Sequence, residues 1–367
     1  MEVGAFQLFR DIAMAETFGI DVSSPAWQAG GWIWLIGTGV VLLSHALING
    51  HGIGLTRRLT DFSGYLILAV AVLLAVALVA YAPVPIELSR LWTFNNFTGS
   101  SGGNVWPHHE SLSLAFMLGM LLVTYTITGF DASAHVAEDT LNAPENARRG
   151  IFYSVFLSVI FGYLLTCAFV LALPDVAQGA SKGSDVFMWL LTSSKMPQSV
   201  RYTLYAGVIL ANYLCGLAGV TSCSRMIFAF ARDGGLPWSQ RLRRVSNENP
   251  QRAIWASAAL AFVCTLYAGA FSVLAAGSAV LLYISYVMPS ASALFATQRH
   301  WLDRAYNLRL LSKPFALFAI LGGLVLTFVG IQPPNQAVGM LIAGMVVFMG
   351  IVWFLFEHRR FKGPPNR

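Results

Sequence analysis

The sequence predicts an all-α, polytopic membrane protein. Of its 367 residues, 56% are hydrophobic and only 11% are charged, the mean hydropathy is +0.63, and apolar runs repeatedly reach the length that crosses a bilayer. The net charge of +6 does not indicate a nucleic-acid partner, because the basic residues lie between the apolar runs. We therefore expect membrane lipid, and no nucleic acid, around this chain.

Nine apolar runs are each long enough to form a membrane-spanning helix. At about 1.5 Å per residue, about 20 residues cover a hydrocarbon core roughly 30 Å thick, and only the sixth and eighth runs are marginal. The runs are Trp27–Asn49, Phe62–Ala82, Leu112 to about Glu138, Gly150–Leu173, Tyr202–Ala231, Ala253–Ala270, Phe271–Thr297, Pro314–Ile331 and Ala337–Phe356.

The basic residues predict the orientation of this nine-span path. Eighteen of the 23 Lys and Arg residues fall on one side of it, and that side is expected to be cytoplasmic. The C-terminus then lies in the cytoplasm and Met1 lies outside. The membrane is expected to be a plasma membrane or a bacterial inner membrane. Residues 1–26 contain no basic segment followed by an apolar core of the kind that forms a signal peptide. We therefore expect further spans ahead of Met1.

The third run is expected to lose its regular helix before it ends. Thr128, Gly129 and Phe130 supply a flexible joint, and small, polar and acidic residues follow with no basic residue before Arg148. A helix that breaks inside a bilayer strands backbone N–H and C=O groups, which is tolerated only beside protein or a water-filled cavity. Broken spans of this kind hold small solutes in transporters, so the break predicts half of a substrate site.

The residues of the break each allow two interpretations. We favour Asp131 as the N-cap of a restarting helix over direct binding of a substrate ammonium, because N-cap carboxylates are common. Glu138 is either a titrating or gate-pairing carboxylate or an interfacial one, with neither favoured. Tyr125 and Phe130 could pack around a substrate, although aromatic residues in spans more often contact lipid or other helices.

Polar residues also fall near mid-depth in two other runs. The amide of Asn212 in the fifth run needs a partner, either a neighbouring helix, which we favour, or a substrate. In the seventh run, Tyr283, Ser285 and Tyr286 lie near the membrane centre, and Pro289 frees the carbonyl of Ser285 and is expected to kink the helix.

An enzymatic interpretation ranks lower. Asp131, His135 and Glu138 could form an acid–base set, and His135 with Glu138 resembles a helical metal pair, but two ligands do not complete a metal site. No nucleotide-binding loop or nucleophile motif accompanies them. We therefore expect no enzyme activity, no cofactor and no metal.

The residues around the break resemble a known family. Thr128–His135 with Glu138, followed by Asn142–Pro144 and Arg149-Gly150, is similar to the sixth span and following loop of amino acid permeases. The nearest likeness is to the amino acid and choline transporter branch of the amino acid, polyamine and organocation superfamily, which includes GABA permeases. Ser224–Pro237 resembles that branch's eighth span, and Leu47–Phe62 resembles its junction between spans four and five.

The resemblance implies the inverted-repeat fold of LeuT-like transporters, with two five-helix repeats, two further helices, and the nine runs at spans four to twelve. The first span, which carries the other half of the pocket in the family, is then absent. The implied divisions are an extracellular remnant of span three and its loop (1–26), the last two helices of the first repeat (27–82), the second repeat (112–297), two additional helices (314–356) and a cytoplasmic tail (357–367).

The resemblance also implies secondary active transport of an amino acid or related amine, GABA-like or choline-like. The backbone from Thr128 through Gly129 to Ala132 then hydrogen-bonds the substrate, and Phe130 gates it. Glu138 or Asp131 carries a coupled proton, with sodium as the alternative ion. Since the first half-site is absent, the alternative function is an inactive truncated permease or an assembly partner that needs its missing spans from elsewhere.

Overall fold

The computed structural model describes residues 6–28, 30–97, 110–246, 249–267, 271–295, 312–332 and 336–360. Within these ranges, each of the nine predicted runs contains one long helix, and the all-helical prediction is confirmed. The long helices are α2 (Trp32–His51), α3 (Ile53–Ala80), α4 (Leu112–Thr126), α6 (Ala143–Ala172), α9 (Gln198–Arg232), α11 (Gln251–Tyr267), α12 (Phe271–Phe295), α14 (Ser312–Gly330) and α15 (Gln336–Val352).

Short helices connect or extend the long ones. Two of them, α5 and η3, follow α4 directly and belong to the predicted break. The short elements are η1 (Phe9–Thr17), η2 (Leu88–Leu91), α5 (Ala132–His135), η3 (Ala137–Asp139), α7 (Val176–Ser181), η4 (Gly183–Asp185), α8 (Val186–Ser193), α10 (Ser239–Leu242), η5 (Trp353–Glu357) and α16 (His358–Arg360).

Six helical segments of the described chain are long and apolar enough to cross a membrane by length and composition, namely α2, α3, α6, α9, α14 and α15 as continued by η5 to Leu355. Two more, α4 and α11, are apolar but shorter. Helix α4 is short because regular helix ends at Thr126, although the run that contains it continues further along the sequence. These helices agree with a polytopic membrane fold.

Helices α3 and α6 begin about two turns earlier than the apolar runs predict, the largest such differences among the long helices. Helix α3 starts at Ile53 instead of Phe62, and α6 starts at Ala143 instead of Gly150. The added turns contain adjacent arginines, which end an apolar run but are good helix formers, so the helices continue beyond the hydrophobic segment. Hydropathy therefore locates the apolar part of a span and not the end of its helix.

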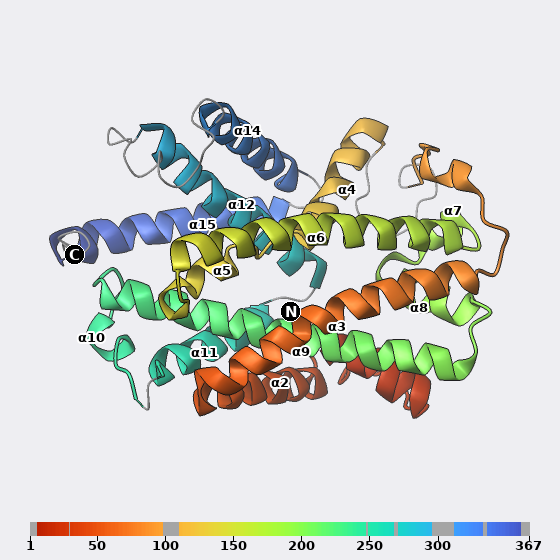
Figure 1. Ribbon diagram of the computed structural model, residues 1–367, viewed down its shortest axis with the longest axis horizontal. Coiled ribbons are helices and arrows are strands. Elements are labelled where there is room, and N and C mark those ends of the chain that lie inside the picture. The colour runs from red at the N-terminus through yellow and green to blue at the C-terminus, as the bar shows by residue number, and fades with distance from the viewer. Residues whose placement is uncertain are drawn as a thin grey trace.

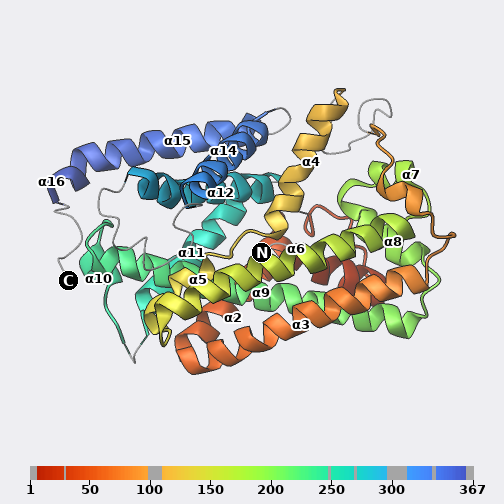
Figure 2. The same cartoon turned by 45° about the horizontal axis from the view of Figure 1, so that its top comes forward.

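Seven of the nine long helices of the described chain form two groups, and the other two, α2 and α11, pack on each other and on α9. In Figure 1, α3, α6 and α9 run side by side along the long axis, and α3 packs on both of the others. Their core contains Leu78, Ala172 and Tyr205, all nearly fully buried, with Leu190 of α8. The second group contains α12, α14 and α15. Helix α4 rises steeply beside it in Figure 2 and packs against α12 and α14.

Candidate functional site

The helix interruption in the third run lies where the sequence predicts it. Helix α4 ends at Thr126, α5 begins at Ala132, and a turn joins them. Within this turn Gly129 has a φ of +87°, a conformation that L side chains rarely adopt. Thr128 closes the end of α4, because both its N–H and its hydroxyl donate to the carbonyl oxygen of Tyr125, at 3.1 and 2.6 Å. The predicted loss of regular helix near Gly129 is confirmed.

Tyr286 of α12 contacts three residues of the interruption. Its hydroxyl accepts a hydrogen bond from the N–H of Gly129 at 3.0 Å and donates one to Oδ1 of Asp131 at 2.9 Å. Its ring lies against Phe130, with 4.4 Å between the ring centroids. One helical turn earlier, Tyr283 donates to the carbonyl oxygen of Thr124 at 3.3 Å. Two tyrosine side chains of α12 therefore hydrogen-bond backbone groups of the broken span.

The structure corrects the predicted role of Asp131. Asp131 occupies the N-cap position of α5, but its backbone is helical and its side chain makes no capping hydrogen bond. The carboxylate instead accepts the Tyr286 hydroxyl through Oδ1, and its Oδ2 lies 3.4 Å from Nε2 of His135. The other ring nitrogen of His135 lies 2.5 Å from Oγ of Ser222 on α9. The prediction failed because a tertiary partner outcompetes the local cap.

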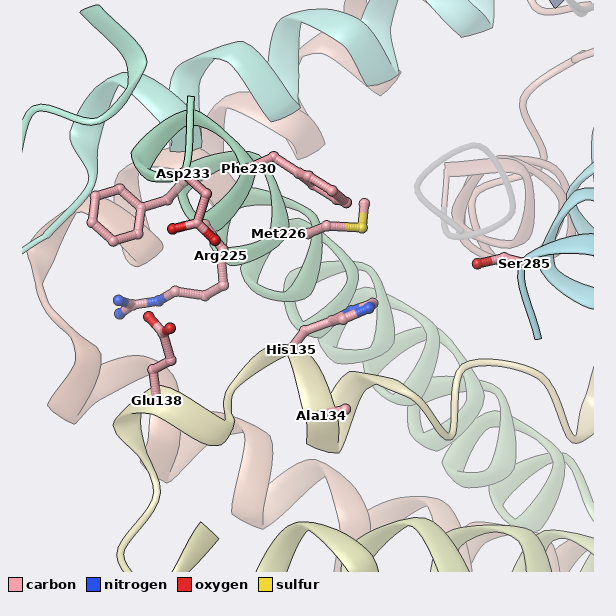
Figure 3. A pocket seen from close by; sticks show the side chains of 10 residues that line it. Ala134, His135, Glu138, Arg225, Met226, Phe230, Asp233 and Ser285 are labelled. Atoms are coloured by element: carbon pink, nitrogen blue, oxygen red, sulfur yellow. The ribbon is translucent and has the colours of Figure 1, made fainter. Parts of the chain in front are cut away.

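Glu138 forms an ion pair beyond α5. Its Oε2 lies 2.5 Å from Nη1 of Arg232, the last residue of α9, and Arg232 also reaches Asp233 at 3.1 Å. Figure 3 shows the carboxylate of Glu138 pointing toward the guanidinium of Arg225 as well. Glu138 therefore connects η3, on the broken span, to the end of α9. Glu138 is partly exposed, and the ion pair is compatible with both interpretations offered by the sequence, so its role stays a prediction.

A glycine-dependent turn places Arg232 and Asp233 opposite Glu138. Gly234 adopts a φ of +82°, and the N–H of Gly235 donates to the carbonyl oxygen of Phe230 at 2.9 Å. This is the hydrogen bond of a Schellman-type helix end, which stops α9 and satisfies a carbonyl of its last turn.

An open pocket of about 400 Å³ lies between α5, η3, α9 and α12, a size within the range of small-molecule sites. Glu138, Arg225 and Asp233 line it together with Ser285 of α12, and the side chain of His135 points into it in Figure 3. None of the predicted substrate-contacting residues from Tyr125 to Ala132 lines this particular pocket. His135 joins the two features, because it contacts Asp131 on one side and the pocket on the other.

Asn212 is not brought to the break by any contact that the structure describes for it. Its side-chain amide donates to the carbonyl oxygen of Val208 in its own helix at 3.1 Å. It lies ten residues before Ser222, which contacts His135, so it is about 15 Å away along α9. Its proposed contact with substrate therefore stays a prediction.

Sequence reasoning did not assign Tyr286, Ser222 or Arg232 to the site. Tyr286 was placed near the membrane centre, which was the available signal, but no sequence pattern pairs it with Gly129. Ser222 and Arg232 lie in one helix with ordinary spacing and carry no site motif. Tertiary packing decides which residues contact a broken span, and these contacts between distant segments leave no local pattern in a single sequence.

Known proteins resemble this chain in sequence over most of its length. Residues 6–356 match the amino acid permease family. The rice amino-acid permease BAT1 homolog is 28% identical over 362 residues, covering 92% of this chain and 68% of its own length. Arabidopsis thaliana amino-acid permease BAT1 is 31% identical over 68% of this chain and 50% of its own length. The thiamine transporter thi9 of Schizosaccharomyces pombe is 31% identical over 61% of this chain and 40% of its own length.

The family match covers nearly the whole chain, including the interrupted span and the helices that contact it. It confirms two predictions made from the sequence, a multi-pass membrane fold and a transport protein instead of an enzyme. The chain nevertheless spans only about half to two thirds of the length of the two BAT1 relatives. On the match over residues 6–356, the chain belongs to the amino acid permease family.

Proposed function

We propose that the protein takes part in secondary active transport of an amino acid or a related amine, and that it belongs to the amino acid and choline transporter branch. The observation that carries the proposal is the interruption at Gly129, where a membrane span gives up regular helix and contacts α12 and α9 instead. Irregular backbone at membrane depth lines substrate sites in transporters. The relatives include amino-acid permeases and a thiamine transporter by name, so their likeness leaves the substrate open.

The interruption offers both a hydrogen-bond donor and a negative charge. The N–H of Gly129 and the carboxylate of Asp131 meet at the same tyrosine hydroxyl. A substrate that carries a carboxylate and an ammonium complements this pair, because an N–H binds the carboxylate and a carboxylate binds the ammonium. Phe130, which lies between them in the sequence and packs on Tyr286, is the proposed gate.

We assign different roles to the two acidic residues. Glu138 is a proposed ion-pair gate at the end of the pocket, separate from the Phe130 gate at the break, because it is held by Arg232 and points toward Arg225. Asp131 is the proposed proton carrier, because its carboxylate lies beside the ring of His135 in the interrupted span. Ionisable residues within membrane spans commonly mark ion and substrate pathways. Sodium stays the alternative coupling ion.

The test is uptake into proteoliposomes that contain the protein, with labelled glycine, alanine, 4-aminobutyrate and choline and an inwardly directed proton gradient. We expect saturable uptake of at least one amino acid, reduced at least tenfold by Asp131→Asn. The matched control is Asp185→Asn, since Asp185 is exposed in a connecting segment and is expected to transport like the unmodified protein. An absence of uptake with every probe would favour the assembly-partner alternative.

The orientation and the internal repeats stay predictions. A single cysteine placed at Arg359, which is exposed, tests the orientation, because we expect a membrane-impermeant maleimide to label it only after the membrane is opened. Labelling in sealed, right-side-out vesicles would place that end of α16 outside and contradict the cytoplasmic C-terminus.

A further inference from the structure

We propose that the Tyr286 hydroxyl is an internal occupant of the substrate site, which holds the place of the substrate's ionic groups until a substrate displaces it. The inference rests on the proposed function and deepens it. Tyr286 lies outside the broken span, and every ligand that enters the site must displace its hydroxyl there.

The hydrogen bonds of Tyr286 are those that the substrate is expected to make. One oxygen accepts from the Gly129 N–H at 3.0 Å and donates to Asp131 Oδ1 at 2.9 Å. The backbone donor and the carboxylate acceptor therefore lie within about 6 Å of each other, which is two hydrogen-bond lengths. An amino acid offers the same pair of functions, since its carboxylate accepts and its ammonium donates. A ligand and the tyrosine hydroxyl thus compete for the same two partners.

Packing holds the tyrosine ring in this place. The ring contacts Phe130, at a centroid distance of 4.4 Å, and Tyr283, at 5.7 Å in an edge-on arrangement. Tyr283 is itself fixed by its hydrogen bond to Thr124. Because Phe130 lies directly on the ring, withdrawal of Tyr286 must also disturb Phe130. Displacement of the hydroxyl therefore links substrate entry to movement of the proposed gate residue.

The competition has a consequence for the affinity of every ligand. A ligand with a carboxylate and an N–H-bearing ammonium replaces both hydrogen bonds of Tyr286. A quaternary amine such as glycine betaine has no N–H to donate to Asp131 and replaces only one. Every ligand displaces the same hydroxyl, so Tyr286 lowers all affinities by one common factor and leaves the ratio between the affinities of two ligands unchanged.

The first test needs no substrate. Hydrogen–deuterium exchange of the peptide that contains residues 127–135 is compared in Tyr286→Phe, Tyr283→Phe and the unmodified protein in lipid nanodiscs. Tyr286→Phe keeps the ring but frees the Gly129 N–H, so we expect exchange there to be faster by about threefold to tenfold. Tyr283 bonds a carbonyl, so its variant is expected to exchange like the unmodified protein. Equal exchange in the two variants would overturn the proposal.

The second test measures binding of glycine and glycine betaine, with 4-aminobutyrate and its trimethyl derivative as a longer pair. We expect Tyr286→Phe to tighten binding of both members of a pair by the same factor, on the order of tenfold, and to leave their ratio unchanged. Weaker binding, or a changed ratio, would show that the hydroxyl contacts the substrate and would overturn the role as occupant. If no probe binds either form, the proposed function fails, whereas the exchange result still decides the position of Tyr286.

Discussion

Replacing Gly129 by alanine separates the backbone conformation of the break from its packing. Gly129 has a φ of +87°, and a Cβ atom added there meets no atom within 4 Å. Gly119, in the regular part of the same span, also has open space where a Cβ atom would lie but has no positive φ. The two glycines therefore differ in backbone conformation and not in available room.

The expected energies have opposite signs. Alanine in a left-handed conformation costs about 1–2 kcal/mol, because its Cβ crowds the following carbonyl. Alanine in place of a glycine inside a helix stabilises by roughly 0.5–1 kcal/mol, because the unfolded chain loses conformational freedom. We therefore expect Gly129→Ala to be less stable than Gly119→Ala by about 2 kcal/mol.

The assay is reversible unfolding by sodium dodecyl sulfate in mixed micelles, followed by circular dichroism. Uptake is measured in parallel, and Gly129→Ala is expected to reduce it more strongly than Gly119→Ala does. Equal stabilities for the two variants would mean that residue 129 lies in ordinary helix, which would refute the account of the break.

Three further predictions concern contacts around the site. A double-mutant cycle of Glu138→Gln and Arg232→Gln should give a coupling below about 1 kcal/mol in stability, since both side chains are partly exposed, while uptake should be impaired in either single variant; unimpaired uptake would exclude the gate role. Thr221→Val removes the 2.7 Å hydrogen bond to Asn49 that joins α9 to α2 and should cost about 1 kcal/mol, whereas exposed Thr166, bonded only within its helix in the described contacts, should tolerate valine; an equal cost at both sites would contradict this. Arg360→Ala should lower the melting temperature because it leaves the buried carboxylate of Glu357 without its partner at 2.9 Å, and Glu357→Gln added to it should recover part of the loss.

The sequence was sufficient to predict the helices because their cause is local. Membrane insertion requires an apolar segment of about 20 residues, and the runs from Trp27 to Phe356 meet or approach this length. The break could be predicted for the same reason, since Gly129 and the small residues after it are visible without a partner. Helix ends were predicted less well, because arginines at the start of α3 and α6 leave the apolar run but not the helix.

The contacts at the break could not be predicted because they join distant segments. The sequence around Asp131 predicts an N-cap, and no local pattern predicts its hydrogen bond to Tyr286, which lies 155 residues later in the chain. The same holds for Glu138 and Arg232, which are 94 residues apart. Arg232 was recognisable as a basic residue at a helix end, where it also favours the helix dipole, and only the packed structure gives it an acidic partner.

The central claim is that the span stops being a regular helix at Gly129 and exposes its backbone to a small charged solute. A spin-label scan from Leu121 to Glu138 in lipid bilayers tests this most directly. We expect the helical periodicity of oxygen accessibility, about 3.6 residues, to end at Thr126, and positions 127–131 to be reached by a water-soluble relaxation reagent and protected by bound amino acid. A continuous helical periodicity to Glu138, with one face in lipid throughout and no protection, would contradict the account.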